Sequence, residues 1–570
     1  MTQLHATPPG GQHGSSQHDP PPRGMSIGEY LIARMRQYKI DDVFGIPGDY
    51  ILTFYGMLEK SPINIVGCTR EDCAGFAADA YARVHGMGAV CVTYCVGGLS
   101  VCNSIAGAYA EKSPVLVISG SPGLAERVNN PLLHHKVRDF RTQIEVFEKL
   151  CVACAELTDP VVAFREIDRV LDAMARYKRP GYIEIPRDMV DVVPHISHAY
   201  HRARSDQDPQ AADEAAEEAA NLLTKAQRPV LIAGVEIHRF NLQDEVVALA
   251  EQMKVPMAAT LLGKSVIPEK HPLYIGLYEG AMGRAEVTKL VEESDCVLLL
   301  GAFMTDLNLG IFTANLDPAK CIYATSETLR IRHHHYHGVG LKEFLDRLAA
   351  RKPEPPVRAI PADIRAERKP FVLDPQAPLT TRRLISRLDE QLDDKSIVIA
   401  DIGNSLFAAT ELTIHAKTEF ISPAYYTSMG FSVPAALGAL TARPESRVVV
   451  IVGDGAFQMT GMELSTIVRR HLSPLIIVLD NEGYGTERFL HEGEWEYNNV
   501  HPWKYSQLPN LLGGGTGYEV RTEGEFEAAL IKAWEDRSAM TLIHAHIPRN
   551  EGSDALVRLA VKLSERVKGK

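Results

Sequence analysis

Short runs of apolar residues recur along the whole chain and constrain its fold more than any other feature of the sequence. Four of them are residues 114–118, 296–300, 448–452 and 475–479. Each run is long enough for one buried strand, whereas a helix that spans a bilayer needs roughly 18–20 apolar residues. Apolar strands that alternate with helices form parallel sheets covered on both faces. The sequence therefore predicts an α/β protein without a membrane span.

The alternation of expected strands and helices occurs in three blocks, residues 25–195, 210–350 and 379–570. The expected strands are residues 43–46, 63–68, 89–94 and 114–120, then 230–233, 296–301 and 321–324, and finally 397–400, 448–452, 475–479 and 541–546. A domain usually has about 150 residues, so 570 residues fit three such blocks. We therefore expect three doubly wound parallel-sheet domains.

Two of the three segments outside these blocks are identified by their composition. Residues 1–24 are rich in Gly, Pro, His, Ser and Gln and lack the apolar stretch of a secretory signal, so we expect a disordered tail. Directly after it, Ser26 and Glu29 form a capping box, which predicts the start of the first helix. Residues 351–378 are rich in proline and charge, a composition typical of a linker.

The composition excludes several classes of protein. Hydrophobic residues make up 45% of the chain and charged residues 23%, as in an ordinary globular protein. The 60 basic side chains are outnumbered by 72 acidic ones, whereas a nucleic-acid-binding protein usually has a basic surplus. Nine cysteines in 570 residues predict free thiols in a reducing cytoplasm.

Three minor clusters favour a structural interpretation. Cys151 and Cys154 form one CxxC pair, but no second pair lies at the spacing that a zinc site needs. The histidines within residues 333–337 lack an acidic or cysteine partner in the sequence, so we expect a solvated loop rather than a metal site. Residues 234–238 follow an expected strand and suit either a nucleotide or effector site or a fold without a ligand.

The most specific motif consists of two polar segments that each follow an apolar run. Residues 453–455 read Gly-Asp-Gly, and residues 480–483 read Asp-Asn-Glu-Gly. One strand–helix–strand unit separates Asp454 from Asn481, so both can lie at the carboxyl edge of one sheet. A carboxylate, an amide oxygen and a backbone carbonyl are hard oxygen ligands, which suit Mg²⁺ bridging a diphosphate. Glycines there also allow close approach of a phosphate.

These segments resemble the diphosphate-binding motif of thiamine diphosphate enzymes. That motif usually ends in two asparagines, and its second position carries the metal ligand, so the resemblance implies Asn481 rather than Asp480. Residues 44–49, Glu71 and residues 76–83 resemble the pyrimidine-binding domain of the same enzymes. The resemblance extends from Met25 to nearly the end of the chain. It implies a pyrimidine-binding, a central and a diphosphate-binding domain, with thiamine diphosphate and Mg²⁺ as cofactors.

Within that superfamily the chain resembles the 2-oxo acid decarboxylases. The matching polar residues are Asp49, the adjacent pair His134 and His135, and Glu487. Segments 110–114, 262–264 and 497–503 match as well. The resemblance implies non-oxidative decarboxylation of a 2-oxo acid (indolepyruvate, phenylpyruvate or pyruvate) to an aldehyde and CO₂ through a thiamine diphosphate ylide and an enamine.

The resemblance also implies roles for individual residues. Glu71 would contact N1′ of the aminopyrimidine, Met429 would wedge between the two rings of the cofactor, and the Thr427 carbonyl would accept a hydrogen bond from the amine. Asp49, His134, His135 and Glu487 would move protons during catalysis. The implied cofactor contacts are Glu71, Asn404, Thr427, Ser428, Met429, Asp454, Gly455, Ala456, Asn481, Gly483, Tyr484, Gly485 and Thr486, of which Asp454, Asn481 and Gly483 would hold the metal.

The family places the two halves of each active site on different subunits, which implies at least a homodimer and favours a homotetramer. The residues expected at the substrate are Ile402, Leu406, Thr486, Leu490 and Leu559, the last on a C-terminal capping helix. Thr486 and Leu559 are smaller than the residues of pyruvate-specific relatives, which favours a longer or aromatic substrate. Two alternatives remain open, a carboligase similar to acetolactate synthase and a relative without catalytic activity.

Overall fold

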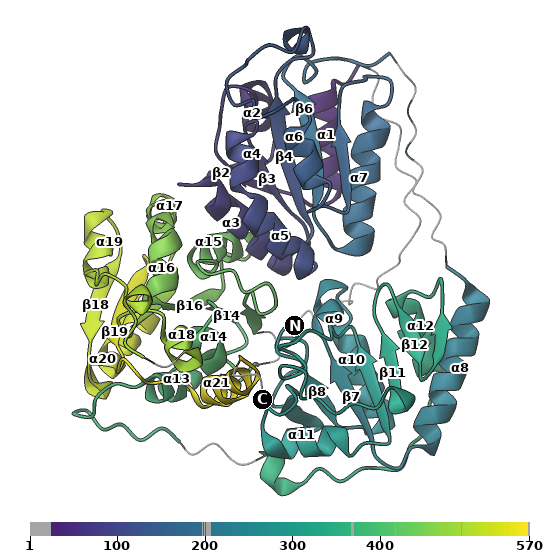
Figure 1. Cartoon of the computed structure of the whole chain (residues 1–570), viewed down its shortest axis with the longest axis vertical. Helices are drawn as coiled ribbons and strands as arrows, with labels where there is room; N and C mark the ends of the chain where they lie inside the picture. Colours follow the sequence, from purple (N-terminus) through teal and green to yellow (C-terminus); the bar gives the residue numbers. More distant parts are fainter. Residues whose placement is uncertain are drawn as a thin grey trace, which may run out of the picture.

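The computed structural model describes residues 24–195, 198, 200, 207–365, 370–415, 418–491 and 493–567. The expected N-terminal tail thus lies outside the described residues, apart from Gly24. Figure 1 shows three α/β lobes, the first drawn in purple and blue, the second in teal and the third in green and yellow. No helix in the described part of the chain combines the length and apolarity that crossing a membrane requires.

The first lobe contains a six-stranded parallel sheet in the order β2-β1-β3-β4-β6-β5. Its strands are β1 (Asp42–Gly45), β2 (Asn64–Gly67), β3 (Gly88–Val92), β4 (Val115–Ser121), β5 (Ala153–Glu156) and β6 (Gly181–Pro186). Its helices are α1 (Ile27–Gln37), α2 (Leu52–Glu59), α3 (Glu71–His85), α4 (Val96–Ser100), α5 (Cys102–Ala110), α6 (Thr142–Phe147) and α7 (Ala163–Tyr177). The capping box at Ser26 and Glu29 is present at the start of α1.

The second lobe has a seven-stranded sheet in the order β13-β12-β11-β10-β7-β8-β9. Its strands are β7 (Pro229–Ala233), β8 (Met257–Ala259), β9 (Tyr274–Leu277), β10 (Cys296–Leu300), β11 (Cys321–Ala324), β12 (Leu329–Ile331) and β13 (His334–Tyr336). Its helices are α8 (Pro209–Lys225), α9 (Val235–Arg239), α10 (Gln243–Met253), α11 (Ala285–Glu292) and α12 (Leu341–Ala350). The sheet is mixed, because the hairpin of β12 and β13 joins β11 in antiparallel orientation.

The third lobe returns to a parallel sheet, in the order β15-β14-β16-β17-β19-β18. Its strands are β14 (Ser396–Ala400), β15 (Glu419–Ile421), β16 (Arg447–Gly453), β17 (Leu475–Asp480), β18 (Thr516–Val520) and β19 (Thr541–His546). Its helices are α13 (Thr381–Asp389), α14 (Asn404–Ala409), α15 (Ser432–Ala442), α16 (Asp454–Thr460), α17 (Leu464–Arg469), α18 (Gly485–Leu490), α19 (Leu508–Leu511), α20 (Glu523–Glu535) and α21 (Asp554–Val567).

The apolar strand residues are buried on both faces of the third sheet, as a parallel sheet requires. Val450 of β16 belongs to one hydrophobic cluster and its neighbour Val449 to another on the opposite face. The first of these clusters continues into the first lobe, where α3 packs against α15. The two helices lie so close that a Cβ atom on Gly438 would come within 2.0 Å of the Ala77 carbonyl oxygen. The first and third lobes of one chain therefore share a core.

The minor clusters have structural explanations. All nine cysteines are free thiols. The histidines of residues 333–337 are exposed, but they belong to the edge hairpin rather than to the expected loop, and the His334 imidazole pairs with Glu218 at 2.9 Å. In residues 234–238, the buried Glu236 carboxylate binds Lys112 of the first lobe at 2.6 Å, which gives this carboxylate a structural partner.

Candidate active site

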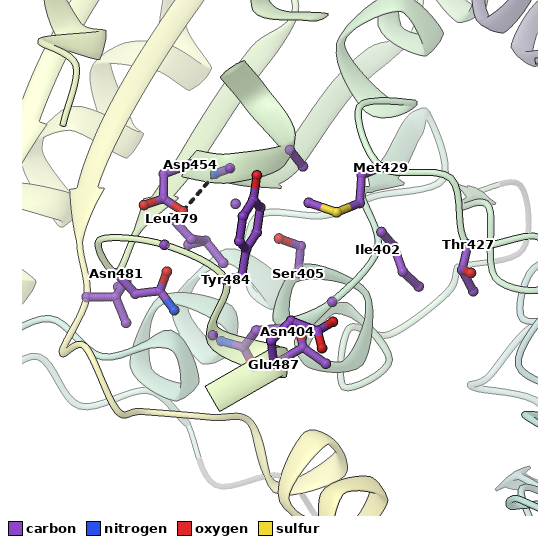
Figure 2. A pocket seen from close by; sticks show the side chains of 18 residues that line it. Ile402, Asn404, Ser405, Thr427, Met429, Asp454, Leu479, Asn481, Tyr484 and Glu487 are labelled. Atoms are coloured by element: carbon purple, nitrogen blue, oxygen red, sulfur yellow. Dashed lines mark hydrogen bonds between the residues drawn. The ribbon is translucent and has the colours of Figure 1, made fainter. Parts of the chain in front are cut away.

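A cavity of about 210 Å³ lies at the carboxyl ends of β14, β16 and β17 (Figure 2). It is the position at which an open parallel sheet binds its ligand. The lining comes from the ends of these strands and the segments that follow them, from residues 427 and 429, and from one residue after β19. The lining residues are Ile402, Gly403, Asn404, Ser405, Thr427, Met429, Gly453, Asp454, Gly455, Ala456, Leu479, Asn481, Gly483, Tyr484, Gly485, Thr486, Glu487 and Ile547.

Oxygen atoms converge at one end of this cavity. Asp454 opens α16 and is only 2% exposed, and its Oδ1 accepts a hydrogen bond of 2.8 Å from the Gly455 amide. Asn481 follows β17 and is buried. Gly483 has φ 140°, and a Cβ atom there would lie 1.9 Å from the Asn498 carbonyl oxygen, so the turn accepts only glycine. A carboxylate, an amide and a backbone carbonyl in this order match the oxygen set that Mg²⁺ prefers.

Electrostatics make this end of the cavity suitable for a cation. Burial and the neighbouring Asp480 carboxylate raise the pKa of Asp454 to about 7. Burial opposes ionisation of Asp480 as well, but the hydrogen bond from His544 Nε2 (2.7 Å) and the Glu482 amide keep the pKa of Asp480 below its usual value. Two carboxyl groups thus share a buried site at which a divalent cation would relieve their repulsion.

The loop with Thr427 and Met429 lines the opposite side of the cavity. Thr427 is a β-branched residue at φ 59°, a strained conformation of the kind that clusters at functional sites. The loop is held on its far side by Asp401, whose carboxylate accepts hydrogen bonds from the Gly430 and Ser432 amides at 3.1 and 2.9 Å. The Met429 side chain points into the cavity in Figure 2 and packs against the core shared by the first and third lobes. The structure therefore fixes an apolar group opposite the oxygen cluster.

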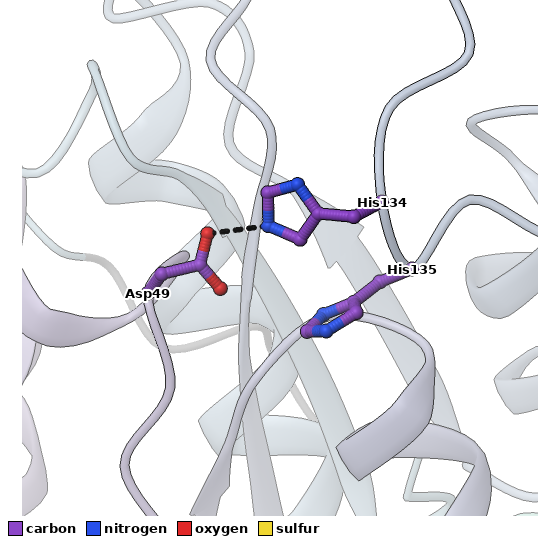
Figure 3. A group of neighbouring side chains, drawn as sticks. All are labelled: Asp49, His134 and His135. Carbon is purple, nitrogen blue, oxygen red and sulfur yellow. Dashed lines mark hydrogen bonds and ion pairs between the residues drawn. The ribbon is translucent and has the colours of Figure 1, made fainter.

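A second group of polar side chains lies in the first lobe (Figure 3). His134 Nε2 and Asp49 Oδ2 are 2.7 Å apart, and the ring of His135 stands edge-on to that of His134. The Tyr50 ring stacks on His134 with 4.8 Å between ring centroids, and burial raises the pKa of the Tyr50 hydroxyl. His135 has φ 65°, and its Nδ1 is buried without a hydrogen-bond partner in the described structure. The sequence-distant Asp49 and histidine pair are thus brought together.

Glu71 also belongs to the first lobe, at the start of α3. Its Cγ would lie 3.8 Å from a Cβ atom built on Gly97, so its side chain runs along the start of α4. Among the residues that the structure describes, only those of the third lobe line the cavity, and Glu71, Asp49, His134 and His135 are not among them. In one chain these four residues of the first lobe therefore do not contribute to the cavity of the third lobe.

Comparison with known proteins places the chain in a family. Three family models of thiamine pyrophosphate enzymes match the chain, the N-terminal TPP binding domain at residues 25–143, the central domain at 216–348 and the C-terminal TPP binding domain at 401–545. Indole-3-pyruvate decarboxylase of Azospirillum brasilense is 36% identical over 545 residues, which cover 94% of this chain and 97% of that protein. Alpha-keto-acid decarboxylases of Mycolicibacterium paratuberculosis and Mycobacterium avium are each 34% identical over 545 residues, covering 94% of this chain and 96% of theirs.

The chain belongs to the thiamine diphosphate-dependent 2-oxo acid decarboxylases. The three α/β lobes of this decarboxylase correspond to the three matched domains, as expected from the sequence. Most residues expected to contact the cofactor line the cavity, whereas Ser428 does not and instead accepts a hydrogen bond of 2.8 Å from Asn103 of the first lobe.

Three of the five residues expected at the substrate do not line this cavity of the decarboxylase. Leu406 and Leu559 are buried in the hydrophobic cluster behind the third sheet, because they occupy the inner faces of α14 and α21. Leu490 is half-buried at the end of α18 and does not reach the cavity. Ile402 and Thr486 do line it.

Sequence reasoning missed several lining residues. Each of three such residues stands beside a residue that the motifs identify or at the end of an expected strand, and this position was the available signal. They are Ser405, Leu479 and Ile547. The pairing of Asp480 with His544 had no sequence signal, because it depends on the neighbouring positions of β17 and β19 in the sheet.

Proposed function

We propose that this chain, with thiamine diphosphate and Mg²⁺, converts a bulky 2-oxo acid such as indolepyruvate or phenylpyruvate to an aldehyde and CO₂. One observation carries the proposal, namely that buried oxygen ligands, the Met429 wedge and the Glu487 carboxylate line a single cavity. An oxygen cluster suits a metal diphosphate, an apolar wall suits the cofactor rings, and an acid lies where the substrate would bind.

Different residues at the cavity would bind different parts of the cofactor. Asp454, Asn481 and the Gly483 carbonyl would hold Mg²⁺ and the diphosphate. The Gly455 backbone beside them lies so close to the Tyr484 ring that a Cβ atom would come within 2.5 Å of it, so only glycine fits there. Met429 and the Thr427 carbonyl would orient the rings, with Glu71 of a second chain against the aminopyrimidine. When bound, thiamine diphosphate supplies the electron sink that loss of CO₂ from a 2-oxo acid requires.

Side chains around the reacting carbon would handle the protons. Glu487 lies on the first turn of α18 at the cavity, where its carboxyl group can give or take a proton. Asp49 orients His134 through the 2.7 Å contact, which fixes the direction of the imidazole. The adjacent His135 would add a second proton carrier to this set.

Within one chain Glu71 and the histidine pair do not line the cavity, so they and the cavity would form two half-sites, and their separation supports an assembly of at least two chains. The pyrimidine half-site of one chain would face the diphosphate half-site of another, so a single chain would lack a complete site. A homodimer is the minimum, and a dimer of such dimers is the proposed tetramer.

The lining of the cavity supports a preference for large substrates. Thr486 is small, and the side chains of Ile402, Leu479 and Ile547 supply an apolar part of the cavity wall. The name of the Azospirillum brasilense relative refers to such an acid, indole-3-pyruvate. A single methylene in an apolar pocket changes specificity by about 1–3 kcal/mol, so loss of the whole aromatic group, as in pyruvate, should be clearly measurable.

The decisive experiment incubates the purified protein with Mg²⁺ and thiamine diphosphate and measures aldehyde release through a coupled alcohol dehydrogenase. Indolepyruvate, phenylpyruvate and pyruvate are compared at equal concentrations. We expect a higher kcat/KM for the two aromatic acids. Equal or better use of pyruvate would refute the proposed preference, and acetolactate in place of aldehyde would refute decarboxylation as the main reaction.

A further inference from the structure

The loop that leads into Glu71 is held by the third lobe of the same chain. The backbone N–H of Thr69 donates a hydrogen bond to Glu463 Oε2 at 3.1 Å, and the Thr69 hydroxyl donates to the same oxygen. The Glu463 side chain is fully buried, although Thr69 itself is exposed. A buried carboxylate that accepts two hydrogen bonds from one residue fixes the position of that residue.

The start of α3 has no side-chain cap at its N-cap position, and within its first turn the Asp72 carboxylate accepts only the Cys73 amide, at 2.9 Å. Arg70 occupies the N-cap position in an extended conformation, and its side chain accepts no bond from the first turn. Helix starts are usually fixed by a Ser, Thr, Asp or Asn side chain at that position. Glu71 is the first residue of α3, two positions after Thr69. The direction of Glu71 is thus set by residues outside the helix.

A second contact fixes the beginning of the same loop. The Arg469 guanidinium donates a hydrogen bond to the Gly67 carbonyl oxygen. The loop of residues 67–70 is therefore attached to the third lobe at both ends, and Glu71 follows directly. Only the Thr69 contact is adjacent to the helix start, because Gly67 is still the last residue of β2.

Glu463 is also connected to the metal ligand of its own chain. Helix α16 begins at Asp454 and continues into the 3₁₀ turn Gly461–Glu463. Thr460 of this segment donates a hydrogen bond of 2.7 Å to the Gly430 carbonyl, next to Met429. The segment is thus fixed against the loop that lines the cavity, and its far end presents the Glu463 carboxylate to Thr69.

We infer that Glu463 is a positioning residue for Glu71. Through Thr69 it fixes the start of α3 and hence the direction in which the Glu71 carboxylate meets the aminopyrimidine. This inference rests on the proposed function, since it requires Glu71 to act on the bound cofactor. Glu463 does not touch the cofactor in the cavity, so its removal should impair proton transfer more than it impairs cofactor binding.

Three variants test the contact. Thr69→Val removes the hydroxyl but keeps the branched shape and the backbone N–H, whereas Thr69→Ser keeps the hydroxyl. Glu463→Gln keeps the shape but removes the charge that strengthens both hydrogen bonds. Arg470→Gln is the matched control, because Arg470 donates to Asn64 Oδ1 at 3.0 Å across the same interface without touching residues 67–71.

The readout is hydrogen–deuterium exchange at C2 of thiamine diphosphate bound to the complete holoenzyme, measured by NMR after acid quenching. We expect Thr69→Val and Glu463→Gln to slow this exchange about tenfold, the effect of about 1.4 kcal/mol. Their Kd for thiamine diphosphate, followed by tryptophan fluorescence, should change less than about threefold. Thr69→Ser and Arg470→Gln should exchange at the wild-type rate.

The double variant Thr69→Val with Glu463→Gln provides the decisive comparison. Because both changes weaken one contact, the double variant should exchange no more slowly than the slower single variant. Unchanged exchange in the single variants, multiplicative effects in the double variant or an equal loss in Arg470→Gln would each overturn the inference. Failure of the proposed function would look different, since the wild type would then exchange the C2 proton but release no aldehyde.

Discussion

Replacing Asp454 by asparagine should make the metal-free protein more stable at pH 8 while it abolishes metal binding. Asp454 is buried beside the charged Asp480, and together these raise its pKa from 3.8 to about 7. A carboxyl group with a raised pKa in the folded state stabilises the fold while it holds its proton. That stability is complete below the unfolded pKa and is lost as the pH rises through the folded pKa.

The two pKa values fix the size and the pH range of the effect. Each pH unit between 3.8 and about 7 is worth about 1.36 kcal/mol. Ionisation of Asp454 therefore lowers the free energy of unfolding by about 4 kcal/mol in total, most of it between about pH 4 and pH 7. Asparagine has the same shape and no charge, so Asp454→Asn removes this loss. Because the first and third lobes share a core, the unfolding unit exceeds about 300 residues, and the expected rise in Tm at pH 8 is roughly 5 °C.

Calorimetry in EDTA at pH 4.5 and pH 8 tests this reasoning. The advantage of Asp454→Asn over the wild type should be small at pH 4.5 and large at pH 8. Addition of Mg²⁺ and thiamine diphosphate should raise the Tm of the wild type alone, because ligands stabilise only a state that binds them. Asp394→Asn, an exposed carboxylate of the same lobe, is the control. Equal stability of Asp454→Asn and the wild type at pH 8 would refute the argument.

Three further predictions concern the assembled site. The variants Glu71→Gln and Asp454→Asn should each be inactive. When their subunits are dissociated and mixed, about one quarter of wild-type decarboxylation should return, because half of the dimers are mixed and each mixed dimer carries one intact site out of two. A mixture without activity would mean that one chain supplies both halves of a site. Thr486→Ile should lower kcat/KM for indolepyruvate about 10–200-fold and for pyruvate much less, as measured by aldehyde release, and a uniform loss would contradict an open pocket at Thr486. Gly483→Ala should raise the Kd for Mg²⁺ and thiamine diphosphate at least about a hundredfold, because its Cβ would lie 1.9 Å from the Asn498 carbonyl oxygen. Gly513→Ala, also at positive φ but in open space, isolates the backbone cost, and similar behaviour of the two variants would exclude the steric explanation.

Local features of the sequence predicted much of the fold and part of the site. The apolar runs became buried strands, and the Ser26 capping box lies at the start of α1. Short or half-exposed strands such as β5 and β18 were not predicted, because their side chains are not apolar throughout. The hairpin of β12 and β13 was not predicted for the same reason, since histidines occupy most of its second strand.

The sequence by itself determined which chemical groups stand after which strands. Asp454 and Asn481 lie at one edge because parallel strands end there, and this follows from spacing alone. Only the tertiary structure showed that Glu71 and His134 do not line the cavity of their own chain. It also showed that Leu406 and Leu559 face the core and that Glu463 contacts Thr69. Spacing along the chain fixes neighbours within one strand–helix unit, whereas contacts across 394 residues depend on how whole helices pack.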